Sequence, residues 1–324
     1  MQYVALGRTG LKVSRLCLGT MTFGDPCDEA TSFAILDRAH DAGVTFIDTA
    51  DAYPLGATGS LIGETERIIG RWLSGRRHDV VLATKCFHAT GPLPFQRGAS
   101  RRHIFESVHA SLKRLNTDFI DLLVMHSYDE DTPIEETLRA LDDLARAGKI
   151  MYYGCSNYTA PQLADALAVG HAHDLDGMVS LQPRYNLVYR EPERDLLPIC
   201  RRMNIAVTPY NPLAGGVLAG KYVSAAEDPQ AQTRFGKPGV VGRIYRDRYW
   251  NQALFDRVEA IKQLAQQWGI ALPTLAVAWT LAQPAVTSTI IGATRVEQME
   301  TTLAGLALQL DAEQLRALAA ITSN

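Results

Sequence analysis

Four residues of different chemical type stand at or just beyond the ends of three successive apolar runs. Asp48, Lys85 and His126 each end such a run, and Tyr53 follows the first one. A phenol can donate a proton, a neighbouring ammonium group lowers its pKa, and a carboxylate pairs with that ammonium. Each residue alone could be an ordinary strand-end or loop residue. Together the four predict an acid–base catalytic site.

Short apolar runs alternate along the whole chain with longer segments whose apolar residues recur at helical spacing. Thr132 and Pro133 predict the start of one helix, and Gly148 predicts its end. Eight strands that are each followed by a helix indicate an α/β fold, the (β/α)8 barrel. The predicted strands are 15–19, 45–48, 80–85, 120–126, 150–156, 178–183, 205–209 and 288–292.

Two segments lie outside this alternation. Residues 1–13 contain two apolar stretches around Gly7-Arg8-Thr9-Gly10, a pattern typical of a β-hairpin, which we expect to cap the bottom of the barrel. Residues 215–248, after the seventh strand, are rich in glycine and mixed charges, and a loop of that length is usually functional. We predict a lid loop there, within one barrel domain that spans 1–324.

The carboxyl ends of the strands carry the catalytic residues in barrels of this kind. Asp48, Lys85 and His126 occupy such ends. Ser156 and Gln182 end later predicted strands, and Tyr210 directly follows another. We therefore expect all these side chains to lie around one opening.

Composition limits the classes of function. The net charge is -3 with both signs scattered, and the basic pairs are short, so neither nucleic acid nor a membrane surface is a favoured partner. Five cysteines without C-x-x-C spacing predict neither a disulfide framework nor a zinc site. The first residues lack the apolar stretch of a signal peptide, and no run approaches the length of a membrane span. We expect a cytoplasmic enzyme without a metal.

Three motifs in their order along the chain resemble those of the aldo-keto reductase family. GVTFIDTADAY contains Asp48 and Tyr53, ATK contains Lys85, and LLVMHSYD contains His126. The similarity extends from residue 3 to about residue 321, nearly the whole chain. The resemblance implies that these four residues form the family's catalytic tetrad.

The later motifs resemble the family's cofactor segments. GCSNY and LQPRYNL resemble the segments that hold the nicotinamide carboxamide. TPYNPLAGGVLAGKY resembles the segment whose tyrosine stacks on the nicotinamide and whose following loop crosses the pyrophosphate. IIGATRVEQMETTL resembles the segment that holds the adenosine 2′-phosphate. A guanidinium suits a phosphate dianion, so Arg295 favours NADPH over NADH. The implied cofactor residues are Thr20, Met21, Ser156, Asn157, Gln182, Tyr210, Asn211, Leu213, Gly215, Lys221, Ile291, Gly292, Thr294, Arg295 and Gln298.

The resemblance also implies a reaction. NADPH would transfer a hydride to a carbonyl carbon while Tyr53 protonates the oxygen, Lys85 held by Asp48 would lower the pKa of Tyr53, and His126 would orient the carbonyl. The substrate is expected to be an aldehyde or ketone with a moderately apolar body, cyclic or sugar-like. The expected pocket walls are Phe23, Phe87, His88 and Tyr128.

Three alternatives stay open at this point. The chain could be a regulatory subunit that keeps the reductase fold and its nucleotide as a redox sensor for a membrane partner. It could be a metal-dependent barrel hydrolase, although among its eight histidines only His126 ends a predicted strand. The same residues could also oxidise an alcohol, because the proton transfers reverse. The oligomeric state is not predicted.

Overall fold

A closed ring of eight parallel strands forms the centre of the computed structural model, which describes residues 1–222, 224–226, 228–230 and 233–322. Neighbouring strands in the ring follow the order β10-β3-β4-β5-β6-β7-β8-β9. A parallel bridge between Val207 and Val286 and a hydrogen bond from the Ile290 amide to the Pro209 carbonyl join the two ends. The barrel predicted from the sequence is confirmed. Its strands are β3 Leu16–Gly19, β4 Phe46–Asp48, β5 Val81–Cys86, β6 Ile120–Met125, β7 Ile150–Ser156, β8 Ser180–Gln182, β9 Ala206–Val207 and β10 Thr289–Ile291.

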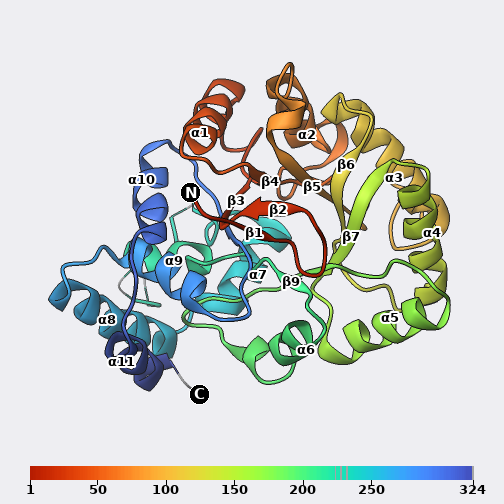
Figure 1. The fold of residues 1–324 in the computed structure, drawn as a ribbon. Coiled ribbons are helices and arrows are strands. Elements are labelled where there is room, and N and C mark those ends of the chain that lie inside the picture. The colour runs from red at the N-terminus through yellow and green to blue at the C-terminus, as the bar shows by residue number, and fades with distance from the viewer. Residues whose placement is uncertain (223, 227, 231–232, 323–324) are drawn as a thin grey trace.

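Helices surround the ring on its outside, as Figure 1 shows. The helices are α1 Glu29–Asp41, α2 Glu64–Trp72, α3 Arg101–Leu115, α4 Ile134–Arg146, α5 Ala160–Ala172, α6 Leu196–Arg202, α7 Gly239–Tyr249, α8 Gln252–Gln267, α9 Leu272–Ala282, α10 Glu297–Leu303 and α11 Ala312–Thr322. Short 3-10 turns occupy Gly59–Leu61, Arg77–Asp79, Glu191–Glu193, Ala214–Ala219 and Ala304–Leu306. None of the described helices is both long and apolar enough to cross a membrane.

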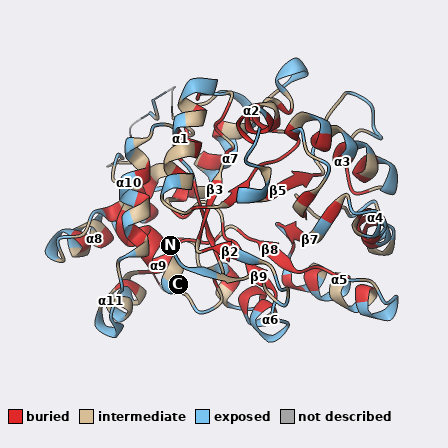
Figure 2. Cartoon of the chain, turned by 45° about the horizontal axis from the view of Figure 1, so that its top comes forward, coloured by how far each residue is buried: buried red, intermediate tan, exposed pale blue. Residues whose placement is uncertain are grey.

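The core has two parts, which follow from the two-residue period of a strand. Ile47 of β4 faces outward into the large cluster between strands and helices, whereas Phe46 faces inward into a smaller cluster inside the ring. Figure 2 shows this burial on the strands and on the inner sides of the helices. The same period turns Asp48 inward above Phe46, and Lys85 of β5 inward above Ala83. Alternation thus brings two charged side chains into the ring.

A two-stranded hairpin closes the bottom of the barrel, as predicted. Strands β1 Tyr3–Ala5 and β2 Lys12–Ser14 pair antiparallel. Leu6 beside this hairpin has no exposed surface and lies in the cluster inside the ring. The Ser14 hydroxyl accepts hydrogen bonds of 3.2 Å from the amides of Thr45 and Phe46, at the start of β4. The hairpin therefore lies at the ends of the strands opposite Asp48 (Figure 1).

The stretch 215–248 is not the single long loop that the sequence predicts. Much of its second half forms α7, in which Gly242, Tyr245 and Tyr249 are buried at spacings of three and four residues. Glycine lowers helix propensity, so the two glycines of this helix hide the pattern in the sequence. Residues 223, 227, 231 and 232 of the stretch lie outside the described residues. Its role as a lid stays a prediction.

One predicted helix boundary is also corrected. Helix α4 has Pro133, not Thr132, at its N-cap, and no side chain caps it. The Thr132 hydroxyl instead donates a 2.8 Å hydrogen bond to Asp129. Gly148, which follows the helix, has the predicted left-handed conformation with a φ of 67°.

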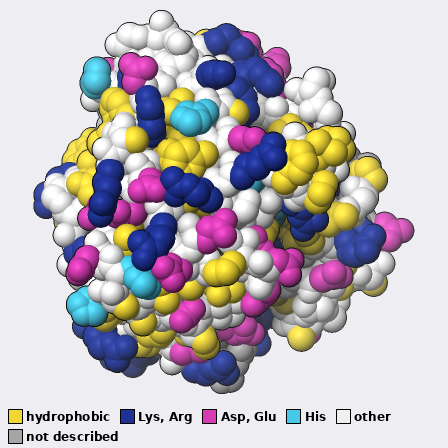
Figure 3. Space-filling view, turned by 90° about the vertical axis from the view of Figure 1, so that its right-hand side faces the viewer, with side chains coloured by type: hydrophobic (Ala, Val, Ile, Leu, Met, Phe, Trp, Pro, Cys, Tyr) yellow, Lys and Arg dark blue, Asp and Glu magenta, His cyan; other side chains and the backbone are white. Residues whose placement is uncertain are grey.

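The outer surface carries interspersed charges of both signs. Figure 3 shows this on one side of the barrel, where lysine and arginine side chains lie among aspartates and glutamates. Typical pairs are largely exposed, such as Arg101 with Asp143, so each contributes at most about 1 kcal/mol. The surface charges do not hold the fold together.

Close contact between α2 and α3 generates the first prediction. The Cβ of an alanine at position 70 would lie 2.2 Å from the carbonyl oxygen of Arg114. The obstacle is backbone, so the helices must move apart, and we expect Gly70→Ala to lower the free energy of unfolding by about 1–3 kcal/mol. Gly10→Ala is the control, because its Cβ would meet nothing within 4 Å. Urea denaturation measures both variants, and equal stabilities would contradict the contact.

Candidate active site

The centre of the site is an ion pair between Lys85 and Asp48 inside the ring. The Lys85 Nζ lies 2.5 Å from Asp48 Oδ2 and donates a second hydrogen bond of 2.8 Å to the Thr49 carbonyl. The side chains of the pair are only 1% and 5% exposed. Thr49 was not among the residues predicted for the site, although it directly follows Asp48.

Tyr53 contacts this ion pair, and His126 contacts Tyr53. The Lys85 Nζ also donates to the Tyr53 hydroxyl at 3.4 Å, and it lies 4.9 Å from the centre of the Tyr53 ring. The rings of Tyr53 and His126 contact edge to face with their centroids 5.9 Å apart. All four residues of the predicted tetrad therefore lie together at the carboxyl ends of β4, β5 and β6.

The pKa of Tyr53 differs from the predicted direction. Burial raises the pKa of this phenol, and the positive charge of Lys85 lowers it but does not offset the burial. The pKa of Lys85 is itself raised, because the attraction of Asp48 and Tyr53 outweighs the effect of burial. At neutral pH the site therefore holds a neutral phenol beside a charged ammonium group. A proton donor is in place.

His126 is a neutral imidazole. Burial, followed by the charges of Lys85 and His88, holds its pKa well below the ordinary value. The ring of His88 lies 4.5 Å from that of His126, centroid to centroid. The Nδ1 atom of His126 is buried without a hydrogen-bond partner. A neutral ring of this kind can donate one hydrogen bond without giving up a proton.

Gln182 and Ser156 extend the site toward β7 and β8. The Gln182 Nε2 donates to the second carboxylate oxygen of Asp48 at 2.8 Å. The Ser156 hydroxyl donates to the Gln182 carbonyl, also at 2.8 Å. Gln182, which the sequence predicts as a cofactor contact, thus holds the Asp48 carboxylate, and Ser156 binds the backbone of Gln182.

Asn157 and Tyr210 complete this side of the site. The Asn157 Nδ2 donates to the His126 carbonyl at 2.9 Å, and its Oδ1 accepts from the Tyr210 hydroxyl at 2.7 Å. Asn157 has a φ of 59°, a left-handed conformation that asparagine tolerates better than most residues. The ring of Tyr210 is thereby held beside the tetrad.

The other predicted cofactor residues divide into two groups. Met21, Asn211, Leu213, Gly215, Lys221, Gly292, Thr294, Arg295 and Gln298 all have some exposed surface. The side chains of Thr20 and Ile291 are buried, and the Thr20 hydroxyl donates to the Asp48 carbonyl instead. The Gln298 Oε1 accepts from the Thr294 amide at 2.8 Å, which links two of the candidates.

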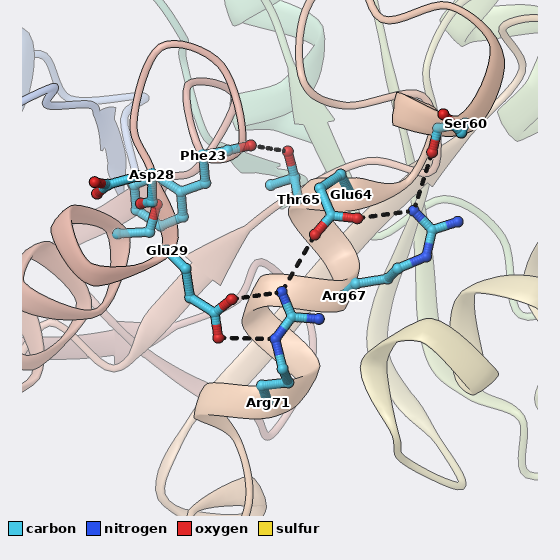
Figure 4. A network of polar contacts seen from close by, with 9 residues as sticks. Phe23, Asp28, Glu29, Ser60, Glu64, Thr65, Arg67 and Arg71 are labelled. Carbon is cyan, nitrogen blue, oxygen red and sulfur yellow. Dashed lines mark hydrogen bonds and ion pairs between the residues drawn. The ribbon is translucent and has the colours of Figure 1, made fainter.

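Of the predicted pocket walls, Phe23 does not reach the site. Its side chain has no exposed surface and packs in the large core cluster. Figure 4 shows its surroundings: the Thr65 hydroxyl of α2 donates to the Phe23 carbonyl, and Arg71 of the same helix binds both Glu64 and Glu29. Phe87, His88 and Tyr128 remain accessible around the opening.

The described residues offer no metal site. They contain no group of three or more His, Cys, Asp or Glu side chains placed to hold a metal ion. All five cysteines are buried and unpaired with one another.

Comparison with known proteins gives the family. The model of the Aldo/keto reductase family matches residues 15–323. The chain belongs to the aldo/keto reductase family. The family resemblance noted in the sequence motifs is confirmed, and the match includes all eight barrel strands, the four residues of the predicted tetrad and the segments predicted to hold the cofactor.

The relatives of this family member carry names of two kinds. An uncharacterised oxidoreductase, YrpG of Bacillus subtilis, is 39% identical, with 98% of this chain and 95% of the relative covered. Versiconal hemiacetal acetate reductase of Aspergillus parasiticus is 32% identical, with coverages of 98% and 96%. A probable voltage-gated potassium channel subunit beta of Oryza sativa is 38% identical, with coverages of 92% and 89%. The oxidoreductase names support an oxidoreductase.

The buried ion pair generates a stability prediction for this protein. Lys85→Met leaves the Asp48 carboxylate buried without its cation, and we expect a loss of about 3–5 kcal/mol in the free energy of unfolding. The double variant Lys85→Met/Asp48→Asn buries no charge at this point, so it should lose less. Urea unfolding at neutral pH measures both. Equal losses would mean that the two charges are not coupled.

Proposed function

We propose that the protein is an NADPH-dependent oxidoreductase that reduces an aldehyde or ketone to an alcohol. The observation that supports this most directly is the position of Lys85, whose ammonium group donates hydrogen bonds to both Asp48 and the Tyr53 hydroxyl. His126 lies against the same tyrosine ring. This arrangement offers a proton donor and a neutral hydrogen-bond donor to one substrate oxygen.

Each residue has a separate role in the proposed reaction. NADPH supplies the hydride when it is bound. Tyr53 is protonated at neutral pH and gives its proton to the substrate oxygen, and Lys85 stabilises the negative charge that then remains on the phenolate. Asp48 holds Lys85, and His126 donates a hydrogen bond where negative charge develops on the oxygen. The same steps in reverse would oxidise an alcohol.

The residues around the tetrad suit a nicotinamide. Ser156, Asn157 and Gln182 offer the hydroxyl and amide groups that a carboxamide needs, and the ring of Tyr210 lies next to them. The Nδ2 of Asn211 is buried without a partner, so a donor remains for a ligand. These observations support the cofactor assignment.

The preference for NADPH depends on Arg295. This side chain is exposed, and it makes no hydrogen bond or ion pair with any residue that the structure describes. A guanidinium can bind the 2′-phosphate of NADPH through two parallel hydrogen bonds, whereas NADH has only a hydroxyl at this position. NADH is therefore the second candidate.

The accessible pocket walls suggest the substrate class. Phe87 and Tyr128 offer aromatic surface, and His88 offers a polar ring next to His126. Such a mixed lining suits a carbonyl compound with a moderately apolar body, cyclic or sugar-like. A fluorescence titration with NADPH and NADH, followed by a spectrophotometric screen of aldehydes, cyclic ketones and keto sugars, tests the proposal.

A second candidate function is a nucleotide-binding regulatory subunit. The relatives named as probable voltage-gated potassium channel subunits beta, from Oryza sativa and Arabidopsis thaliana, favour it, with 38% and 39% identity. Tight NADPH binding with very slow turnover of every carbonyl tested, together with copurification of a membrane partner, would support this candidate. Rapid turnover of a carbonyl favours the enzyme.

The first functional prediction concerns Tyr53→Phe. The variant keeps the ring but has no proton to donate, so we expect carbonyl reduction to slow by about 10²–10⁴-fold. Binding of NADPH should change little, because the lost hydroxyl contacts Lys85 and not the residues proposed to hold the cofactor. Stopped-flow measurement of NADPH oxidation and a fluorescence titration check the two parts. Reduction at the wild-type rate would remove Tyr53 from the chemistry.

The second functional prediction concerns Arg295→Ala. Loss of a charge-assisted contact should raise the Kd for NADPH about tenfold or more and leave the Kd for NADH nearly unchanged. Arg146→Ala is the control, because this largely exposed arginine ends α4 and pairs with Asp142 on the outside of the barrel. Fluorescence titrations measure all three proteins. Equal changes for the two nucleotides would exclude Arg295 from a phosphate site.

A further inference from the structure

A second group of buried ionisable residues lies behind the tetrad. Asp51 and Glu66 both have no exposed surface. Asp51 follows Asp48 by three residues and precedes Tyr53 by two, and Glu66 lies on α2. The mechanism above uses neither carboxyl group.

The two carboxyl groups differ in their partners. The Glu66 Oε1 accepts from the Thr84 hydroxyl at 2.6 Å, and its Oε2 accepts from Arg114 Nε at 2.7 Å. Neither side-chain oxygen of Asp51 has a hydrogen-bond partner of normal geometry. A fully buried carboxylate without partners is costly, whereas a carboxylic acid is much less so.

This group is joined to both catalytic segments. The Asp51 amide donates to the Lys85 carbonyl at 3.0 Å. Thr84, which binds Glu66, directly precedes Lys85, and the Gly63 amide donates to the Tyr53 carbonyl at 3.0 Å just before α2 begins. On its outer side α2 is held by the ion pairs of Figure 4, so Glu66 has a fixed position. A movement of Asp51 would therefore change the position of Tyr53, which lies two residues further along the same segment.

The charges around Asp51 favour its neutral form. Burial and then the nearby Glu66 raise the pKa of Asp51 to about 8, and Arg114 and Ser107 offset this only in part. Of the other groups that face this region, His103 of α3 has a lowered pKa, and burial raises the pKa of the Cys86 thiol of β5. Both are therefore neutral at pH 7. The positive charge of Arg114 therefore compensates the negative charge of Glu66, and it cannot compensate a second carboxylate at Asp51 as well.

We propose that Asp51 is a positioning residue for Tyr53, and that its neutral carboxylic acid form keeps the Tyr53 segment in place. When Asp51 loses its proton to solvent, two buried carboxylates face one guanidinium, and the segment that carries Tyr53 is displaced. The effect on catalysis depends on the proposed carbonyl reductase function. The effect on folding does not.

The sign of the pH dependence follows from linkage. Asp51 holds its proton to a higher pH in the folded chain than in the unfolded chain, whose aspartates titrate near pH 4. The stability that it contributes is complete below about pH 4 and is lost as the pH rises toward the folded pKa, which is about 8. The wild-type protein should therefore lose thermal stability as the pH rises from about 4 to about 8, and Asp51 should cause no further loss above that pH.

The experiment compares the wild type with Asp51→Asn, which cannot ionise. We measure Tm, kcat and KM from pH 6 to pH 9.5 with NADPH and a carbonyl substrate, and Asp118→Asn, an exposed aspartate, is the control. In the wild type and the control, Tm should fall from pH 6 to about pH 8 and then level off, and kcat should fall as the pH rises through about 8, with little change in KM. In Asp51→Asn both declines should be reduced.

Each outcome decides the proposal. Identical pH profiles of Tm and kcat for Asp51→Asn and the wild type would overturn it. A flattened Tm profile with an unchanged kcat profile would reduce Asp51 to a structural residue. If Asp51→Asn does not fold, Glu66→Gln replaces it, and the decline of Tm should then end at a lower pH, because removal of the repulsion lowers the folded pKa of Asp51. A wild type without carbonyl turnover would contradict the proposed function and leave the Tm test intact.

Discussion

The ion pair between Asp48 and Lys85 constrains the rest of the structure. Two charges inside a barrel lose their hydration, and their attraction offsets this only if geometry and hydrogen bonding are nearly complete. The Gln182 amide donates a hydrogen bond to the Asp48 carboxylate, and the Thr49 carbonyl accepts one from the Lys85 ammonium group. The strands β4, β5 and β8 must therefore keep their register, because a shift of one residue would turn Asp48 or Lys85 into the apolar layer outside the ring.

The barrel interior is consequently divided along its axis. Apolar side chains such as Phe46 and Ala83 fill the lower part together with Leu6 beside the hairpin, and the polar residues occupy the carboxyl ends of the strands. The polar layer then extends outward to Asp51 and Glu66, behind β5. The proposed catalytic residues and the buried carboxyl groups behind them thus belong to one continuous set of contacts, which links the position of Tyr53 to the packing between α2 and α3.

The sequence predicts the strands and the tetrad well, because apolar runs and polar strand ends are local features. It does not predict burial depth. The pKa of Tyr53 is raised because the phenol lies deep in the barrel, and the Phe23 side chain is withdrawn because it packs in the core between strands and helices. Helix α7 was missed since its glycines weaken the local signal, and its stability comes from the burial of Tyr245 and Tyr249. These differences arise from contacts between distant segments.

The hairpin has a practical consequence for handling the protein. Its strands seal the end of the ring opposite Asp48 and Tyr53, and residue 1 lies beside them (Figure 1). An affinity tag or a surface anchor attached at residue 1 would leave from the sealed end. Molecules immobilised on a sensor chip in this way would present the end that carries Asp48 and Tyr53 to the flowing solution.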